Sequence, residues 1–469
     1  MLFNSYIFWV FLALVLILHR ALPHRGQNRV LLVASYVFYG YWDWRFLALI
    51  WASTIIDFVV AQQISGAELP KVRKRWLKVS LIANLGFLGF FKYFNFFADS
   101  FASMLRSFGV EASNVDLNIV LPVGISFYTF QTLSYTIDVY RGHTKVVRNL
   151  EDFALYVAFF PQLVAGPIER SSQLLPQIQN ARKRVGESDF AEGLCLIISG
   201  LFKKVVIADS MATYANAIFA TPADQLTGPE AIIGVYAFAF QIYGDFSGYS
   251  DIARGVSRWL GFNLMVNFRM PYFAPNITEF WRRWHISLSG WLRDYLYIPL
   301  GGNRKGKLMT YRNLMLTMLL GGLWHGASWT FVVWGALHGF YLAVHKMMGG
   351  SRLRAMGPVR KLFGIVFTFH LVCLAWIFFR AESFDQAWSF LVAIATNWET
   401  SQFAIFGMAF VTFYVLPLLI YELWLSRAGD MLALVQVHWG YRAAVYSFAA
   451  LMILFFHAPI PAEFIYFQF

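Results

Sequence analysis

The chain has 469 residues, of which 58% are hydrophobic and only 14% are charged, and its mean hydropathy is +0.53. A soluble domain has roughly 25% charged residues, so this composition excludes an ordinary soluble enzyme and predicts a membrane protein with many spans. The net charge of +12 does not indicate nucleic-acid binding, because the basic residues lie in short loops between apolar runs, as in membrane proteins. The two cysteines, Cys195 and Cys373, lie in apolar segments and form neither a metal-binding spacing nor a disulfide framework.

The N-terminal third is expected to form helical spans at 5–18, 30–41, 46–60 and 79–97. Two basic loops, at 20–29 and 71–78, are separated by two of these spans and therefore lie on the same side of the membrane. The positive-inside rule makes that side cytoplasmic. The sequence thus predicts a multi-pass membrane protein whose N-terminus lies outside the cytoplasm; the family resemblance described below implies that this membrane is the bacterial inner membrane and that the N-terminus is periplasmic.

Further spans are predicted at 121–139, 190–207, 231–246, 311–324, 329–344, 362–379, 403–423 and 441–456, with shorter elements at 153–164 and 386–394. Lys203 and Lys204, near the end of one span, are expected to reach the interface. The pattern changes at 251–312, where no window is long and apolar enough to span, so this segment is expected on the cytoplasmic side, partly re-entrant. The chain is predicted to be an all-α polytopic membrane protein of about 11–13 transmembrane and re-entrant helices. One membrane domain is expected over 1–469, with N-terminal spans at 1–110, a motif-bearing core at 117–380 and C-terminal spans at 381–469.

Two polar stretches lie at membrane depth. In the first, Pro122 and Gly124 precede Tyr128 and Gln131, and a proline can kink a span and let its backbone line a cavity. A tunnel-lining role and ordinary helix packing both remain open for this stretch. In the second, we expect Asp245 to position a histidine or bind a cation, whereas Asp251 is interpreted as a solvated helix end.

The run from 276 to 295 predicts one amphipathic helix that begins near Glu279, with Thr278 as its N-cap. Large apolar residues recur at helical spacing and form a stripe: Trp281, Trp284, Leu288 and Trp291. Planar cationic groups suit the phosphates of an anionic donor such as coenzyme A, and this run offers Arg282, Arg283 and Arg293. The alternative is an interfacial helix whose arginines touch lipid headgroups. Residue chemistry alone favours a structural role for His285 over a catalytic one.

His325 lies in the apolar run Gly321-Gly322-Leu323-Trp324-His325-Gly326-Ala327-Ser328-Trp329. Transfer of an acyl group from a thioester to a hydroxyl needs a base, and imidazole has a suitable pKa. Ionisable residues inside a membrane are costly and therefore functional by default. Residue chemistry leaves catalysis and packing open for His325, and it favours packing for His338 and His370.

Several long runs resemble the membrane-bound O-acyltransferase family, in the same order: 121–141, 166–170, 241–254, 280–302 and 321–329. The run Trp376-Ile377-Phe378-Phe379-Arg380 is similar to the bacterial alginate O-acetyltransferase branch. The resemblance covers essentially the whole chain. It implies a helical bundle around a central tunnel, in which donor and acceptor approach from opposite faces. The family's essential histidine falls on His325 and its second polar position on His285, which overturns the structural interpretation of His285.

The resemblance further implies an acetyltransferase that takes acetyl groups from cytoplasmic acetyl-CoA, with no covalently bound cofactor. Its implied partners are a periplasmic acetyltransferase, membrane lipid and, indirectly, an exopolysaccharide such as alginate or cellulose. For His325, the roles of general base and transient acyl carrier both remain open. A transporter or polysaccharide flippase, with His325 and Asp245 as a proton relay, is the rival hypothesis, although the sequence lacks the inverted repeats that many transporters show.

Overall fold

The computed structural model describes residues 1–111, 113, 117–350, 357–459 and 462–465. Throughout these ranges every regular element is a helix and no strand occurs, which confirms the all-α prediction. The chain divides into two compact units. Unit 1 comprises Met1–Val185 with Ser257–Leu264, and unit 2 comprises Gly186–Val256 with Met265–Phe469.

Several helical stretches have the length and composition to cross a membrane. Within the described ranges, four meet both criteria: His24–Gly66, Pro70–Ser107, Pro358–Arg380 and Gln402–Ala428. Two shorter apolar helices, Tyr6–Ala21 and Trp439–Phe455, lie where the first and last spans are predicted. The polytopic character is therefore confirmed, whereas the total of 11–13 membrane-associated helices stays a prediction.

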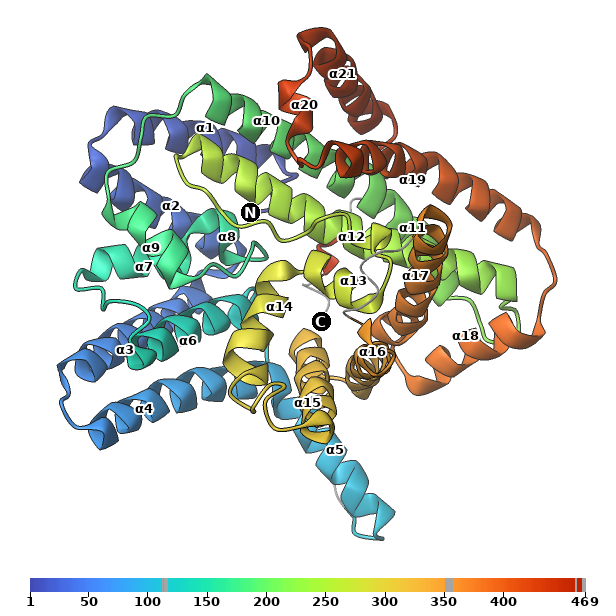
Figure 1. Ribbon diagram of the computed structural model, residues 1–469, viewed down its shortest axis with the longest axis horizontal. Helices are drawn as coiled ribbons and strands as arrows, with labels where there is room; N and C mark the ends of the chain where they lie inside the picture. The colour runs from blue at the N-terminus through green and yellow to red at the C-terminus, as the bar shows by residue number, and fades with distance from the viewer. Residues whose placement is uncertain (112, 114–116, 351–356, 460–461, 466–469) are drawn as a thin grey trace. The chain divides into compact units, whose positions relative to one another are not determined.

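Unit 1 begins with five α-helices and the short helical segments between them (Figure 1). They are α1 (Tyr6–Ala21), α2 (His24–Asp43), η1 (Trp44–Phe46), α3 (Leu47–Gly66), α4 (Pro70–Leu88), η2 (Gly89–Tyr93) and α5 (Phe94–Ser107). The predicted break between α2 and α3 is present, where the Asp43 side chain accepts from the Arg45 amide. The basic run at 71–78, expected as a loop, is instead helical: Pro70 occupies the first turn of α4, where a missing N–H costs nothing.

The rest of unit 1 contains α6 (Ile125–Arg141), α7 (Leu150–Ala158), α8 (Phe160–Leu163) and α9 (Ser171–Gln179). The helices α7 and α8 are short, as the apolar run at 153–164 predicts. Figure 1 shows α3, α4 and α6 side by side. Their shared interior holds Asp57, whose carboxylate accepts hydrogen bonds from Ser80, from Asn84 at 2.8 Å and from Thr136 at 3.0 Å. A buried carboxylate satisfied from two neighbouring helices fixes how the three helices pack.

Unit 2 begins with α10 (Glu187–Leu201), the π-helix η3 (Phe202–Ala208), α11 (Asp209–Phe219) and α12 (Gly228–Trp259), whose last residues belong to unit 1. The helix α12 has 32 residues and runs well past Asp251. The expected change of pattern at 251, with Asp251 as a solvated helix end, is therefore wrong. Asp251 is buried and pairs with Lys203 at 2.8 Å and with Arg254 at 3.2 Å, so charged residues continue the helix without facing water.

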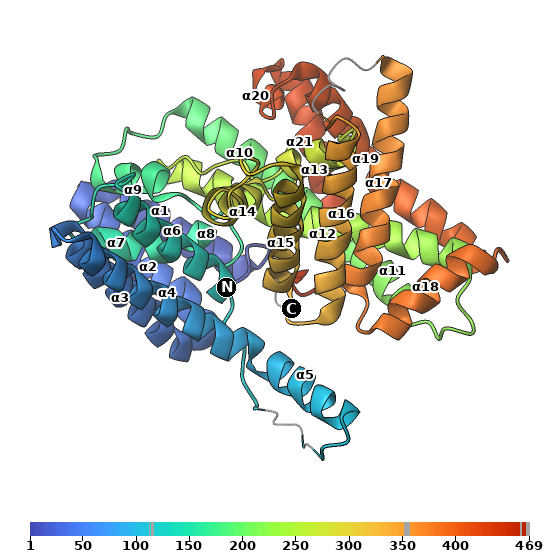
Figure 2. The same ribbon diagram turned by 60° about the horizontal axis from the view of Figure 1, so that its bottom comes forward.

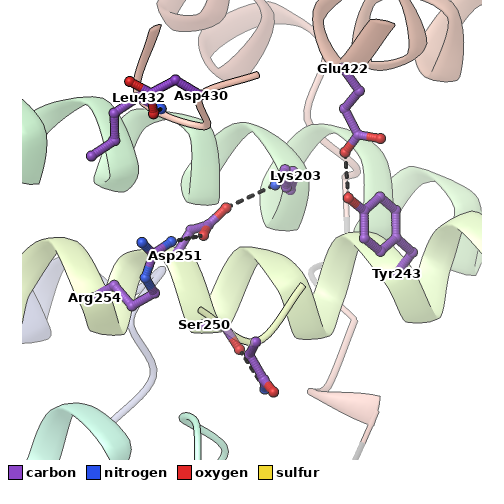
Figure 3. A network of polar contacts seen from close by, with 9 residues as sticks. Lys203, Tyr243, Ser250, Asp251, Arg254, Glu422, Asp430 and Leu432 are labelled. Carbon is purple, nitrogen blue, oxygen red and sulfur yellow. Dashed lines mark hydrogen bonds and ion pairs between the residues drawn. The ribbon is translucent and has the colours of Figure 1, made fainter. Parts of the chain in front are cut away.

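The two lysines of η3 do not reach an interface, contrary to expectation. Figure 3 shows Lys203 pointing at Asp251 of α12. Lys204 is equally buried and pairs with Asp209 at 2.8 Å and with Asp245 at 2.9 Å. Carboxylates on α11 and α12 thus replace water as partners of both ammonium groups.

The run at 276–295 forms two short helices rather than the single one predicted. They are α13 (Ile277–Arg283) and α14 (Ile286–Leu292), followed by the π-helix η5 (Arg293–Tyr297). The N-cap of α13 is Asn276, whose side chain accepts from the Glu279 amide, and not Thr278. Because the chain turns at 284–285, the stripe from Trp281 to Trp291 does not lie along one helix.

The remainder of unit 2 contains the short helix η4 (Pro271–Phe273), α15 (Lys307–His325), α16 (Trp329–Met347), α17 (Pro358–Arg380), α18 (Phe384–Thr396), α19 (Gln402–Ala428), α20 (Ala433–Gln436) and α21 (Trp439–Phe455). Figure 2 shows α15, α16 and α17 side by side. The turn between α15 and α16 is the one predicted, and Ser328 caps α16 by accepting from the Thr330 amide.

Candidate active site

His325 is the last residue of α15 and is only 3% exposed. Its imidazole lies among aromatic rings, with centroid distances of 5.0 Å to Trp324, 5.0 Å to Trp334 and 5.4 Å to Phe379. These rings come from α15, α16 and α17, so three adjacent helices enclose the histidine. Enclosure by aromatic rings keeps bulk water away from the imidazole and strengthens any electrostatic interaction that it makes.

Glycines allow α15 and α16 to cross closely behind this histidine. A Cβ added to Gly322 would lie 2.2 Å from the carbonyl oxygen of Phe331, and one added to Gly335 would lie 2.3 Å from that of Met318. No side chain fits at such distances. Gly322 of α15 and Gly335 of α16 therefore allow the two helices to pack closely.

His285 occupies the turn between α13 and α14 in the left-handed backbone conformation, with φ of 42° and ψ of 56°. Few residues other than glycine adopt this conformation, which is held only where the surroundings dictate it. The side chain is fully buried, and its Nδ1 lies 3.2 Å from Oδ1 of Asn267. The ring packs edge-on to Phe246 of α12, with centroids 4.6 Å apart.

The two histidines are neighbours. Their ring centroids are 6.3 Å apart, although 40 positions separate His285 from His325 in the sequence. Trp284 and Trp334 extend the aromatic wall, and both rings contact Trp376 of α17, at 5.2 and 5.8 Å. The structure thus brings two buried imidazoles together in unit 2.

Comparison with known proteins shows to which family the chain belongs. The model of the MBOAT, membrane-bound O-acyltransferase family matches residues 38–381, which include both histidines. The chain belongs to the membrane-bound O-acyltransferase family. It is therefore an O-acyltransferase, as the resemblance of its motifs predicts.

Three relatives of this chain are named with different acceptors. The probable alginate O-acetylase AlgI of Azotobacter vinelandii is 48% identical over 86% of this chain and 80% of its own. The peptidoglycan O-acetyltransferase of Helicobacter pylori is 39% identical over 76% of this chain and 71% of its own. The teichoic acid D-alanyltransferase of Bacillus subtilis is 28% identical over 57% of this chain and 71% of its own. The three names describe acyl transfer to alginate, to peptidoglycan and to teichoic acid, respectively.

The helices that flank His285 in this acyltransferase have seven residues each, which is too short to span a membrane. Burial lowers the pKa of the His285 imidazole to about 3, so its ring is neutral at working pH. A neutral imidazole carries one N–H and one lone pair, as a proton acceptor requires.

The two other histidines singled out by the sequence have different surroundings. His338 of α16 is fully buried; its Nδ1 accepts from Trp281 Nε1 at 3.3 Å, and its ring stacks on Phe280 at 6.1 Å. His370 of α17 is exposed and lies 2.7 Å from the hydroxyl of Tyr236. The burial of His338 fits the packing role expected for it, whereas His370 is exposed, and the roles of both residues stay predictions.

The predicted donor-binding arginines of the acyltransferase lie near the histidine turn. Arg282 is on α13 and pairs with Glu279 at 2.6 Å, and Arg293 pairs with Asp294 at 2.7 Å; both guanidinium side chains are about two-thirds exposed, at 60% and 66%. Arg283 donates to the carbonyl of Phe273 at 3.4 Å. Two exposed cationic side chains near a buried histidine are compatible with an anionic donor, and donor binding itself stays a prediction.

The other predicted site residues are placed as follows. Asp245 accepts from the Ile465 amide at 2.7 Å as well as pairing with Lys204. Tyr128 and Gln131 are buried on α6 of unit 1, where Gln131 donates to the carbonyl of Tyr156 at 2.6 Å. Their roles in a tunnel stay predictions.

Asn267 was not identified by the sequence analysis, although its side chain contacts His285 directly. No spacing rule connects it with His285, because it lies in an irregular segment after α12. Its one signal is the isolated polar position in the run 264–268, Leu-Met-Val-Asn-Phe. Within the described ranges, no group of three or more His, Cys, Asp or Glu side chains is arranged to hold a metal ion.

Proposed function

We propose that this acyltransferase moves acetyl groups from cytoplasmic acetyl-CoA across the bacterial inner membrane to a periplasmic partner acetyltransferase, which O-acetylates an exopolysaccharide. Alginate is the proposed polymer, because the relative at 48% identity is named as an alginate O-acetylase. The observation that carries the proposal is the contact of two buried imidazoles, His285 and His325, each within a motif that resembles the family's.

The reaction follows from the chemistry of a thioester and a hydroxyl. The acceptor oxygen attacks the thioester carbonyl carbon, so a C–O bond forms and the C–S bond breaks. His325 takes the proton of the hydroxyl and returns it to the departing sulfur, which leaves as the free thiol of coenzyme A. Alternatively His325 carries the acetyl group transiently between donor and acceptor. In both routes His285 is the neutral neighbour that orients the reacting groups.

The remaining predicted residues have proposed positions along the route of the substrates. Trp281, Trp284 and the three arginines of the run 276–295 are assigned to the donor, whose phosphates need cationic partners. Tyr128, Gln131 and Asp245 are assigned to the tunnel. The basic residues at 71–75 support a cytoplasmic start of α4, and with it the periplasmic N-terminus.

The test is His325→Ala in cells that make the polymer, with His370→Ala as the matched control. We expect the acetate content of the exported polymer to fall by about 100-fold or more for His325→Ala, because a general base contributes that much to the rate. The control keeps its acetate, since His370 lies outside the pair of histidines. Protein abundance and polymer export are expected to stay unchanged in both strains.

Normal acetylation in the His325→Ala strain would contradict the catalytic role of this histidine. Loss of polymer export, with the protein present, would instead favour the polysaccharide flippase. A scaffold that only recruits a periplasmic enzyme would tolerate the substitution, since it uses no buried imidazole.

A further inference from the structure

Asn267 lies beside the histidine turn and is held there by the main chain. The Arg269 amide donates to the carbonyl of Arg283, and the Ile286 amide donates to the carbonyl of Asn267, both at 2.9 Å. The segment 267–269 therefore runs alongside 283–286, with a hydrogen bond on each side of His285. The side chain of Asn267 is 1% exposed, so it has no access to water.

The backbone N–H of Ser287, which can only donate, fixes the orientation of the Asn267 side-chain amide. The backbone N–H of Ser287 lies 3.2 Å from the side-chain atom assigned as Oδ1. A backbone amide only donates, so the atom that faces it must be the oxygen. Ser287 Oγ donates to the same oxygen at 3.0 Å, and Asn267 Nδ2 donates to the hydroxyl of Ser250 at 3.3 Å. Figure 3 shows Ser250 on α12, with its hydroxyl in this hydrogen bond.

This orientation determines which nitrogen of His285 carries the proton. Its Nδ1 lies 3.2 Å from the same Oδ1 and 3.4 Å from Ser287 Oγ, whose single hydrogen is directed at that Oδ1. A carbonyl oxygen only accepts, so Nδ1 donates to it. A neutral imidazole has a single N–H, and Nε2 therefore carries the lone pair. His338 has the opposite arrangement, because its Nδ1 accepts from Trp281.

We infer that Asn267 is a positioning residue: it holds His285 in the Nδ1–H tautomer and orients the ring so that Nε2 is the atom that accepts a proton or a hydrogen bond during acyl transfer. The inference rests on the proposed function of His285. The partner of the ring nitrogen sets tautomer and orientation, as with the outer partners of metal-bound histidines. The left-handed backbone at His285 belongs to the same arrangement, since the Asn267 carbonyl binds the next amide.

Aromatic rings from α12, from the segment after it and from α15 face the His285 imidazole. From α12 and the segment after it, Phe246 and Phe268 face the imidazole, with centroids at 4.6 and 6.3 Å. From α15 the neighbours are Trp324 and His325, at 6.0 and 6.3 Å. A charge introduced at Asn267 is therefore expected to act on His285 first.

The direct test is the tautomer of His285 in the full-length wild-type protein in lipid, by nitrogen-15 magnetic resonance of its histidine rings. The His285 signal is assigned by its loss in His285→Asn. We expect a neutral ring with the proton on Nδ1. A proton on Nε2, or on both nitrogens at neutral pH, would overturn the inference. This measurement requires no variant of Asn267 to fold.

The functional test compares Asn267→Asp with Asn276→Asp. Both exchange an amide for a carboxylate of the same shape, and Asn276 only caps α13, a role that aspartate also fills. A carboxylate at 267 favours the protonated ring and raises the pKa of His285, so the neutral form becomes available only at higher pH. Because burial holds the wild-type pKa at about 3, we expect the activity of Asn267→Asp relative to the wild type to fall at the acid end of the profile, and the profile of Asn276→Asp to match that of the wild type.

The assay is incorporation of label from acetyl-CoA into polymer by permeabilised cells at a series of pH values, relative to the amount of each protein. A profile for Asn267→Asp that superimposes on that of the wild type would contradict a positioning role. Failure of the proposed function would appear differently: the wild type would incorporate no label, or His325→Ala would incorporate as much as the wild type. The tautomer measurement depends on neither of these activity results.

Discussion

His285 and His338 are both fully buried imidazoles next to tryptophan side chains, but their ring nitrogens face different partners. Nδ1 of His338 accepts from an indole N–H, whereas Nδ1 of His285 faces an amide oxygen and donates. The sequence alone predicts packing for both, because burial and a neighbouring tryptophan look alike in either case. The resemblance to the acyltransferase family separates them, and the contacts of Asn267 give the separation a physical basis.

At His285 we expect asparagine to be tolerated far better than alanine. Both substitutions remove the imidazole, but asparagine enters the left-handed conformation readily and keeps a polar side chain, whereas a left-handed alanine costs about 1–2 kcal/mol and has no polar side-chain atom. His285→Asn should accumulate like the wild type and retain measurable acetylation. His285→Ala leaves the reacting groups without this orienting side chain and should lose about 100-fold in acetylation. Membrane abundance and polymer acetate are the measurements. Equal acetylation in the two variants would argue against a polar role for residue 285.

At the scale of helices, patterns within one segment predicted more than contacts between segments. The ends of α15 and α16 around the His325 turn, the break at Asp43 and the short helices at 153–164 follow from local apolar and polar patterns. The continuation of α12 past Asp251 was not predicted, because it depends on cations supplied by η3 and by the next turn of α12. Likewise, the helix at 276–295 breaks at His285 because the distant segment 267–269 binds that turn.

Close packing of α15 on α16 requires a glycine at position 335. In Gly335→Ala the new Cβ would meet the carbonyl of Met318, so the helices must separate and the stability is expected to fall by about 1–3 kcal/mol. The matched control is Gly86→Ala on α4, where nothing lies within 4 Å and alanine gains about 0.5–1 kcal/mol of helix stability. Thermal unfolding in detergent and polymer acetylation measure the difference. The account of this crossing fails if Gly335→Ala is as stable and active as Gly86→Ala.

At the scale of the whole chain, composition and charge predicted the class of protein and the all-α fold, and family membership confirms both. The structure divides the chain into two compact units, each with buried polar groups joining its helices: Asp57 in unit 1 and the lysine–carboxylate pairs in unit 2. Local sequence patterns do not reveal such groups, because their partners lie on other helices. The topology in the membrane stays a prediction from the positive-inside rule.

That topology is testable with single cysteines at two exposed positions. Lys74→Cys on α4 is expected to react with a membrane-impermeant maleimide only after the cytoplasmic side is opened, whereas Asp224→Cys should react in intact spheroplasts. The native Cys195 and Cys373 are buried and contribute little background. Reaction of both positions from the same side would contradict the proposed arrangement, which places an odd number of crossings between them.

The central claim is that acetyl groups pass through the pair of buried histidines in unit 2. Its most direct measurement is the transfer of label from cytoplasmic acetyl-CoA to exopolysaccharide in permeabilised cells that carry wild type, His325→Ala or His370→Ala at equal abundance. The account predicts that label reaches the polymer in the wild type and in His370→Ala, and that transfer by His325→Ala is lower by about 100-fold or more. Undiminished transfer by His325→Ala would contradict it.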